Sequence, residues 1–187
     1  MVVGGGIAGI QASLDLAESG YKVYLIEKRS AIGGHMAKLD KTFPTNDCAM
    51  CTISPRLVDA GAHPNIEILT DSEVAALDGQ AGAFTATLRM RPRFIDTGVC
   101  NGCGKCAEVC PESLPSLFDE GLRLQRAAYR LYPQATPDAY AIEKRGVSPC
   151  RDACPAGQRA QGYIALIREG RYADALRTIR EDNPFPA

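Results

Sequence analysis

Four cysteines stand close together in the segment Cys100–Pro111, which reads CNGCGKCAEVCP. The spacing CxxCxxCxxxCP is the bacterial iron–sulfur run, in which thiolates of one short loop reach different irons of a cubane. Gly102 and Gly104 suit such a loop, because they allow left-handed backbone and bring N–H groups toward the sulfides. Structural zinc prefers two separated CxxC pairs, so the spacing favours a [4Fe–4S] cluster. The predicted ligands are Cys100, Cys103, Cys106 and Cys110.

The end of this motif is repeated further along the chain. Residues 150–155, CRDACP, match the CxxxCP ending, but lysine and valine occupy the positions where the two preceding cysteines would stand. The repeat therefore supplies half of a ligand set, Cys150 and Cys154. Because the cysteine before proline ligates the other cluster in two-cluster ferredoxins, two assignments stay open. Either Cys110 completes the first cluster, or Cys154 does and Cys110 pairs with Cys150 at a second.

A glycine motif opens the chain and predicts the element that would position a redox cofactor. Gly4, Gly6 and Gly9 satisfy GxGxxG after two valines, a helical pattern covers residues 10–18, and the β-rich segment KVYLI ends at Glu27. This order is that of a dinucleotide-binding βαβ unit, with the acid placed to contact a ribose. In such a unit the first glycine makes the turn, the second admits the pyrophosphate, and the third lets helix and strand pack closely.

The residues after this unit indicate FAD rather than NAD. Glu27-Lys28 is followed by the glycine pair of Gly33-Gly34-His35, an extension that resembles FAD-binding flavoproteins. The segments NIEIL and FTATLRM alternate as strands do, and Val74 lies where a flavoprotein strand passes the adenine. His63, beside a proline, is expected to be a turn residue. The predicted cofactor contacts are Gly4, Gly6, Ile7, Ala8, Gly9, Glu27, Lys28, Gly33, Gly34, His35 and Val74.

Cys48 and Cys51 form a further pair, in the sequence CAMC. Thiols two residues apart grip one metal ion or close a reducible disulfide. The position after the dinucleotide unit favours a disulfide facing the flavin, whereas the cluster assignment of the other six cysteines favours ligation. Both interpretations stay open beside that of an inert pair, and the sequence-based assignment places both residues with the metal ligands.

The segments beyond the four-cysteine loop carry less information. Residues 119–132 predict a helix, and residues 133–140 an irregular stretch rich in proline. A second helical pattern begins near residue 158, breaks at Gly170 and resumes over residues 172–180. Its GRYADAL stretch is also typical of a tetratricopeptide hairpin, but that architecture needs several stacked copies, and one is present.

Composition sets the outer bounds. The chain has 187 residues, 45% of them hydrophobic, and a formal net charge of −1, so no electrostatic case exists for nucleic acid or an anionic membrane. No apolar run approaches the roughly 18 residues that span a bilayer, and no signal peptide is recognisable. Eight cysteines without an export signal favour metal ligation in a reducing compartment. We therefore expect a soluble cytoplasmic protein that binds neither nucleic acid nor membrane.

Three stretches carry a family resemblance. GGGIAGIQASLDLAESGYKVYLIEK, IGGHMAKLDKTFPTNDCAMC and CNGCGKCAEVCP together resemble the A-subunit of heterodisulfide reductase over residues 1–145. The resemblance implies an FAD domain of the thioredoxin reductase type with an inserted ferredoxin segment, the flavin hub of a multi-subunit electron-transfer complex. The C-terminal stretch is similar to the N-terminal iron–sulfur helical domain of dihydropyrimidine dehydrogenase and of the small subunit of glutamate synthase, without its leading CxxC. That likeness implies coupling to an NAD(P)H-linked module or a ferredoxin.

These observations predict an α/β protein in three parts. Residues 1–95 form an incomplete Rossmann-like FAD-binding domain, residues 96–146 a ferredoxin-like [4Fe–4S] insertion, and residues 147–187 an α-helical iron–sulfur segment, also incomplete. We expect part of a larger flavin- and iron–sulfur-dependent oxidoreductase subunit that relays electrons between FAD and [4Fe–4S] clusters, with no acid–base catalytic residue. The alternatives are an electron-carrier module without flavin and, less favoured, a zinc-stapled interaction domain.

Overall fold

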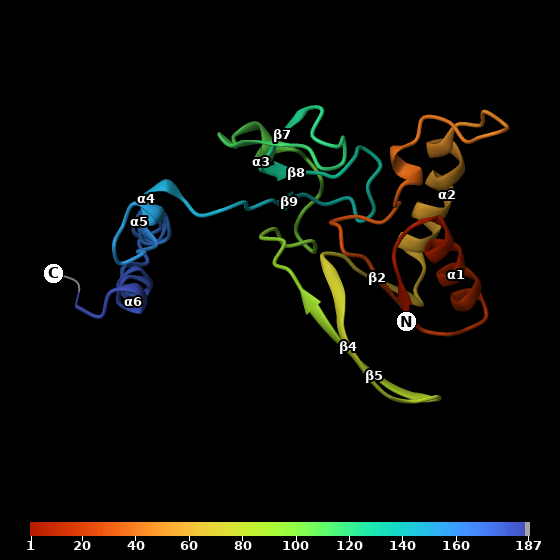
Figure 1. Cartoon of the computed structure of the whole chain (residues 1–187), viewed down its shortest axis with the longest axis horizontal. Helices are drawn as coiled ribbons and strands as arrows, with labels where there is room; N and C mark the ends of the chain where they lie inside the picture. The colour runs from red at the N-terminus through yellow and green to blue at the C-terminus, as the bar shows by residue number, and fades with distance from the viewer. Residues whose placement is uncertain (186–187) are drawn as a thin grey trace. The chain divides into compact units, whose positions relative to one another are not determined.

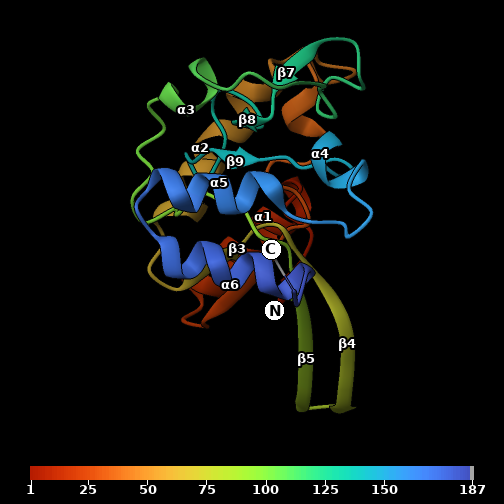
Figure 2. The ribbon, with the colours of Figure 1, turned by 90° about the vertical axis from the view of Figure 1, so that its left-hand side faces the viewer.

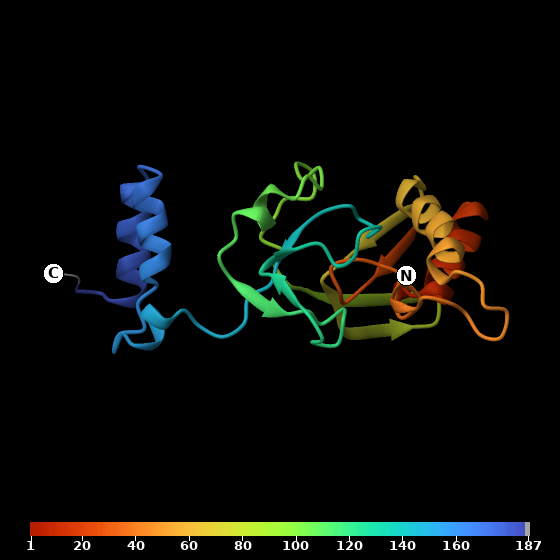
Figure 3. The same ribbon diagram turned by 90° about the horizontal axis from the view of Figure 1, so that it is seen from above.

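The structure is a computed structural model, and it describes residues 1–185 of the 187-residue chain. The chain divides into two compact units, the first spanning Met1–Glu143 and the second beginning at Lys144. Figure 1 shows the elements in chain order, and Figure 3 shows them from above. The glycine motifs and the four-cysteine loop lie in the first unit, and the CRDACP repeat lies in the second.

A parallel sheet forms the N-terminal part of the first unit. Its three strands are β1 (Val2–Val3), β2 (Val23–Ile26) and β3 (Ile66–Leu69), with β2 in the middle. The connecting helices are α1 (Ile7–Glu18), the short 3₁₀ helix η1 (Met36–Lys38) and α2 (Ala49–Ala62). The order corresponds to strands 3-2-1 of the dinucleotide-binding fold. The predicted βαβ unit is therefore present, and its first helix begins three residues before residue 10, at Ile7.

Apolar periodicity explains why these elements form. Ile10, Leu14 and Ala17 recur on one face of α1, and all three are buried. Ile53 and Leu57 do the same in α2. Both helices lay these faces against the sheet, where three of the four β2 residues are buried. The largest fully buried side chains of this core are Ile10, Val23, Leu25, Ile26, Ile32, Ile53 and Leu57.

A long antiparallel hairpin follows the sheet. Strand β4 (Ser72–Gln80) pairs with β5 (Ala83–Met90) from Ser72 opposite Met90 to Gln80 opposite Ala83. Most of its side chains are exposed, and Figure 2 shows it extending away from the parallel sheet. The strand predicted from FTATLRM is confirmed.

The rest of the first unit consists of short elements. α3 (Lys105–Glu108) lies within the four-cysteine loop, and four strands follow in two antiparallel pairs. The helix predicted over residues 119–132 is wrong. Glu120 and Gly121 have φ values of 54° and 80°, which make a turn that no right-handed helix contains. The strands are β6 (Ser113–Pro115), β7 (Leu124–Arg126), β8 (Ala128–Tyr129) and β9 (Ala141–Ile142).

Tyr132 anchors this region to the parallel-sheet region. Its hydroxyl donates to the backbone carbonyl of Ile32, and its ring stacks on Phe118 with the centroids 5.3 Å apart. The backbone N–H of Ile32 in turn donates to the carbonyl of Thr136 at 2.9 Å. Tyr132 is only 4% exposed, and burial raises its pKa to about 12, so the phenol stays a donor at neutral pH.

The second unit is helical. α4 (Pro149–Asp152) precedes a hairpin of α5 (Ala160–Arg168) and α6 (Tyr172–Asp182), so the two predicted helices and the break at Gly170 are confirmed. Arg159 closes the hairpin through ion pairs with Asp182 at 2.8 Å and Glu181 at 2.6 Å. Within residues 1–185, none of the helices has the length and apolar character needed to cross a membrane.

Candidate dinucleotide and iron–sulfur site

The first glycine turn connects β1 to α1 with very little space. Gly4 has a φ of 98°, and its N–H donates to the carbonyl of Ile26 at 2.8 Å. A Cβ on Gly9 would lie 1.9 Å from the carbonyl oxygen of Gly4, so only glycine allows the helix this close to the turn. A Cβ on Gly6 would meet no protein atom within 4 Å. The turn is therefore open on the side of Gly6, the N-cap of α1, where no side chain caps the helix.

A second glycine turn packs directly on the first. The N–H of Gly33 donates to the carbonyl of Gly5 at 2.6 Å, and a Cβ on Gly34 would lie 2.8 Å from the Cα of Gly6. Gly33 also lies against Tyr132. A Cβ added to Gly33 would stand 2.5 Å from the phenol oxygen of Tyr132. The two glycine pairs that the sequence places about thirty residues apart thus make one continuous backbone surface.

Glu27 follows β2 and supports the first turn. Its side chain is buried, with one carboxylate oxygen accepting the N–H of Gly5 at 2.7 Å and the other accepting the N–H of Arg29 at 2.8 Å. A carboxylate has about four acceptor positions, so both oxygens retain lone pairs for a ribose hydroxyl. Lys28 and His35 are exposed. Among the remaining predicted contacts, Ile7 and Ala8 open α1, and Val74 is half-buried in β4.

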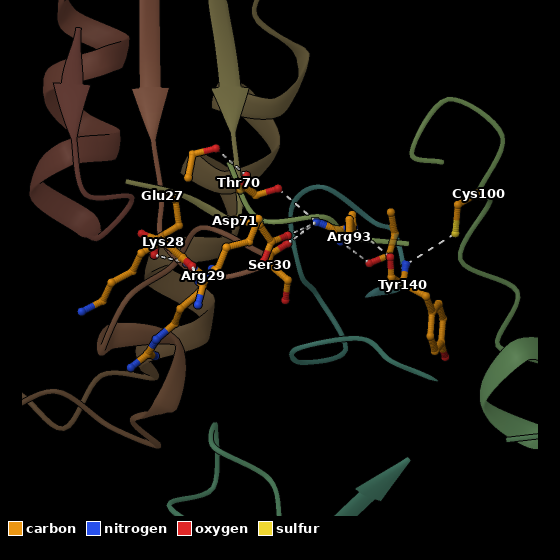
Figure 4. A network of polar contacts seen from close by, with 12 residues as sticks. Glu27, Lys28, Arg29, Ser30, Thr70, Asp71, Arg93, Cys100 and Tyr140 are labelled. Carbon is orange, nitrogen blue, oxygen red and sulfur yellow. Dashed lines mark hydrogen bonds and ion pairs between the residues drawn. The ribbon is translucent and has the colours of Figure 1, made fainter. Parts of the chain in front are cut away.

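Arg93 joins the parallel sheet to the segment beside the cysteine loop (Figure 4). On one side its guanidinium donates to the carbonyl of Ser30 at 2.8 Å and the hydroxyl of Thr70 at 3.0 Å, residues that follow β2 and β3. On the other side it donates to the carbonyls of Ala139 and Tyr140 at 2.7 Å and 2.8 Å. A planar guanidinium with five donors is the side chain that can bridge two backbone segments in this way.

Arg93 also forms an ion pair with Asp71 at 3.4 Å, and both side chains are largely buried, at 10% and 16% exposed. Burial raises the pKa of Asp71 and lowers the pKa of Arg93, and for each group it outweighs the attraction of the other charge. The attraction between the two charges is therefore weaker than the cost of removing them from water. We infer that Arg93 is held mainly by its neutral oxygen acceptors and that its role is to join two segments.

This imbalance predicts the effect of Asp71→Asn. A carboxyl group whose pKa is higher in the folded than in the unfolded state stabilises the fold at pH values below the unfolded pKa, near 3.9. This stabilisation is lost as the pH rises through the folded pKa. Asn tolerates the φ of 53° at this position. At pH 7 we expect the free energy of unfolding of the variant to lie no more than about 1 kcal/mol below that of the wild type. The neutral acceptors of Arg93 remain, and the amide oxygen of asparagine is still an acceptor. Urea titrations at pH 4 and pH 7 should show the wild type losing stability relative to the variant as pH rises; a gain would contradict the sign.

The cysteine loop is held against residues 138–140. The N–H of Tyr140 donates to the sulfur of Cys100 at 3.4 Å, so the Arg93 acceptor Tyr140 also contacts the first predicted ligand. Gly102 and Gly104 have φ values of 70° and 83°. A Cβ on Gly102 would lie 2.6 Å from a carboxylate oxygen of Asp138, which shows how closely the loop and this segment approach.

The donor set of the loop fits a [4Fe–4S] cluster. Its four cysteines are free thiols, the loop bends at left-handed glycines, and a backbone N–H already points at one sulfur, as in protein-bound clusters. Backbone N–H groups, that of Ala128 first, lower the pKa of Cys110 and so favour its thiolate. The fit is one of residue type, spacing and loop backbone, because over residues 1–185 no three His, Cys, Asp or Glu side chains lie together as metal ligands. Cys150 and Cys154 are free thiols of the second unit.

The structure joins Cys48 and Cys51 by a disulfide at the start of α2. In this oxidised form neither sulfur is a thiolate, so neither is available as a metal ligand. His63, at the end of the same helix, accepts the N–H of Asn65 at its Nδ1, 3.1 Å away, which confirms its prediction as a turn residue.

Three residues of this site were not predicted from the sequence: Arg93, Tyr132 and Tyr140. Arg93 and Tyr132 bind backbone carbonyls of residues distant in the sequence, whereas Tyr140 contributes its own N–H to Cys100 and its own carbonyl to Arg93. No motif surrounds the three. The nearest signal was the position of Arg93 in the stretch that leads into the cysteine loop, which does not identify its partners.

Comparison with known proteins agrees with this geometry. A family model described as NAD(P)-binding Rossmann-like domain matches residues 2–69, and one described as 4Fe-4S binding domain matches residues 93–113. Fold and site together define a Rossmann-like dinucleotide domain combined with a [4Fe–4S] segment, and the glycine turns fit FAD.

Curated relatives share about half of their aligned residues with this chain. The iron-sulfur A-subunit 2 of CoB--CoM heterodisulfide reductase from Methanopyrus kandleri is 52% identical over 142 residues, which are 76% of this chain and 22% of the relative. The A-subunit of H(2):CoB-CoM heterodisulfide,ferredoxin reductase from Methanothermobacter marburgensis is 51% identical over 144 residues, 77% of this chain and 22% of the relative. This chain is thus homologous to the A-subunit of heterodisulfide reductase over about three quarters of its length, and it spans about a fifth of those relatives.

Two other similarities are weaker. A protein of Archaeoglobus profundus that is named as similar to the A-subunit of heterodisulfide reductase is 44% identical over an alignment of 181 residues, which covers 84% of this chain and 26% of the relative. Among solved structures, L-proline dehydrogenase from P. horikoshii aligns with 47% of this chain and 18% of its own, at 25% identity and a TM-score of 0.41.

Proposed function

We propose that this chain is the flavin- and cluster-binding part of an oxidoreductase subunit of the heterodisulfide reductase A type. FAD would be held at the paired glycine turns and a [4Fe–4S] cluster at Cys100, Cys103 and Cys106 with Cys110 or Cys154. When bound, the flavin would convert between two-electron and one-electron transfer, and the cluster would exchange electrons singly. The observation that carries the proposal is that one residue, Arg93, contacts both the strand ends beside the glycine turns and the segment bonded to Cys100.

The residues around the glycine turns have separable roles. The uncapped N–H groups at the start of α1 face the open side of Gly6, where a diphosphate gains hydrogen bonds and the favourable end of the helix dipole. Glu27 fixes the turn through Gly5 and offers its remaining lone pairs to a ribose hydroxyl. The family model names NAD(P), whereas the second glycine pair on the first favours the larger dinucleotide FAD.

The partners belong to the proposal as well. The relatives are named as subunits, so we propose that this chain works with other subunits of an electron-transfer complex. The C-terminal stretch is similar to the iron–sulfur domain in the small subunit of glutamate synthase, which favours an NAD(P)H-linked module or ferredoxin as the electron source or sink. Anaerobic reconstitution tests the cofactors: iron, sulfide and FAD together support the proposal. Iron and sulfide without flavin indicate an electron carrier, and zinc without sulfide contradicts both.

Gly6→Ala is the sharpest test of the flavin site. Gly6 has a φ of −76°, and its added Cβ meets no protein atom, so the fold should tolerate alanine without loss of stability. The same methyl group would stand where the diphosphate approaches, and we expect FAD affinity to fall at least about tenfold, or about 1.4 kcal/mol. Quenching of flavin fluorescence on titration measures the affinity.

The matched control is Gly162→Ala in α5, where the nearest atoms to a Cβ lie at an ordinary 3.8 Å. It should leave FAD affinity unchanged, and it should not lower thermal stability, because alanine favours a helix more than glycine does. Gly9→Ala, by contrast, should destabilise the turn itself, because its Cβ overlaps the carbonyl of Gly4. Unchanged FAD binding by a folded Gly6→Ala protein would place the flavin elsewhere.

A further inference from the structure

The disulfide between Cys48 and Cys51 is placed for chemistry rather than for holding the fold together. It links residues only three positions apart, so it closes almost no loop and adds little entropic stability. Both cysteines are exposed, and neither belongs to the buried core under α2. An exposed short-range disulfide is open to attack by external thiols.

The start of α2 distinguishes the two sulfurs. Cys48 is the N-cap residue of this 14-residue helix, and its sulfur accepts the backbone N–H of Cys51 at 3.1 Å. After reduction, that hydrogen bond and the helix dipole stabilise negative charge on Cys48. The sulfur of Cys51 lies one turn along and has no hydrogen-bond partner among residues 1–185 that matches this contact. Cys48 is therefore the nucleophile and Cys51 the resolving thiol.

The preceding loop keeps this arrangement after the sulfurs separate. Lys41 and Cys48 form an antiparallel bridge, and the N–H of Thr42 donates to the carbonyl of Asp47 at 2.8 Å. At the helix start, the hydroxyl of Thr52 donates to the carbonyl of Cys48 at 3.0 Å. These hydrogen bonds involve no sulfur atom, so they keep the two thiols adjacent when the disulfide is reduced. The disulfide can then re-form without a rearrangement of the backbone.

We propose that Cys48 and Cys51 are a redox-active dithiol–disulfide couple that exchanges electron pairs with external thiols and disulfides. In the oxidising direction the Cys48 thiolate attacks a substrate disulfide, forms a mixed disulfide and releases one substrate thiolate. Cys51 then attacks Cys48, the mixed disulfide breaks, and the second substrate thiolate leaves. Two electrons pass to the substrate, and the two thiol protons of the protein go to the released thiolates. Reduction by an external dithiol runs in reverse and yields the oxidised dithiol.

A redox titration of the full chain with reconstituted cofactors tests the couple directly. The protein is equilibrated with mixtures of reduced and oxidised glutathione and acid-quenched. Free thiols are labelled with one alkylating mass tag, and the remaining cysteines with a second after reduction. Trypsin should release residues 42–56, which contain Cys48 and Cys51 and no other cysteine. We expect this peptide to change from two tags of one kind to two of the other in a single two-electron transition. A peptide that never forms the disulfide overturns the proposal.

Substitutions separate the two roles. A reduced protein treated with an aromatic disulfide should release two aromatic thiolates per pair. Cys51→Ser should release one and keep the other as a stable adduct on peptide 42–56. Cys48→Ser should react at least about tenfold more slowly at that peptide. Val58→Ala, which trims a 62% exposed side chain of the same helix, should leave the peptide's reaction unchanged. Equal reaction rates in the two variants of the pair contradict the assignment of roles.

Cluster ligation is the rival role, and iron content distinguishes it. If Cys48 and Cys51 are redox-active, Cys48→Ser and Cys51→Ser proteins retain the iron and sulfide of the wild type. Loss of iron equal to that of a Cys103→Ser protein makes them ligands and overturns the proposal. Thermal unfolding shows whether each variant is folded; for one that is not, the peptide titration of the wild type decides. Neither outcome depends on FAD binding, so failure here leaves the proposed function intact.

Discussion

Replacing Cys103 with serine is expected to abolish the [4Fe–4S] cluster. Cys103 is exposed at the centre of the loop, between the two left-handed glycines, with its N–H bonded to the side chain of Asn101 at 3.3 Å. A serine hydroxyl keeps the shape but lacks the thiolate that holds iron in such clusters. Iron and acid-labile sulfide should fall to the level of unreconstituted protein, and the EPR signal of the reduced cluster should vanish.

The control for this variant is Val99→Ala, one residue before Cys100, where an 81% exposed side chain makes no contribution to ligation. It should keep the full EPR signal, and far-UV circular dichroism should be the same in both variants. A cluster retained by Cys103→Ser would show that the loop is not the ligand set.

The fourth ligand follows from the same measurement. Cys110 belongs to the same short loop as Cys100, Cys103 and Cys106, whereas Cys154 lies 44 residues further along the chain. We therefore expect Cys110→Ser to lose the cluster and Cys154→Ser to keep it. The reverse result would support the crossed assignment of two-cluster ferredoxins.

Replacing Arg93 with alanine is expected to destabilise the first unit by about 3 to 5 kcal/mol, the usual cost of removing one partner of a buried ion pair. The substitution leaves the carboxylate of Asp71 buried without its cation, and the carbonyls of Ser30, Ala139 and Tyr140 lose a donor. It also frees the segment whose N–H contacts Cys100. Urea unfolding followed by far-UV circular dichroism measures the loss; the chain has no tryptophan to report it by fluorescence.

Two variants show which part of the interaction matters. Arg93→Lys keeps the charge but cannot bridge two backbone segments, so it should recover only a minor part of the stability. Asp71→Asn removes the ion pair and keeps the neutral acceptors, so it should cost far less than Arg93→Ala. If Arg93→Lys behaves as the wild type, charge rather than geometry is the stabilising feature.

Sequence reasoning identified the features whose signal is local. Glycine spacing, alternation in strands and cysteine spacing act over a few residues, and they predicted the βαβ unit, the hairpin strand, the two C-terminal helices and the iron–sulfur segment. The family comparisons confirm the Rossmann-like and [4Fe–4S] assignments. The helix predicted over residues 119–132 failed, because its apolar pattern fits short strands as well, and the turn at Glu120 and Gly121 selects the strands.

Tertiary structure decided how these parts meet. The sequence by itself determined that two glycine turns and a four-cysteine loop are present, since each is a pattern along the chain. Three contacts join groups that lie up to 100 residues apart in the sequence. They are the hydrogen bond of Gly33 to Gly5, that of Tyr132 to Ile32, and the contacts by which Arg93 joins the sheet to the cysteine loop. Most of these acceptors are backbone carbonyls, which every residue carries. Because every residue has a backbone carbonyl, the sequence does not indicate which carbonyl a side chain binds. Only the folded chain shows it.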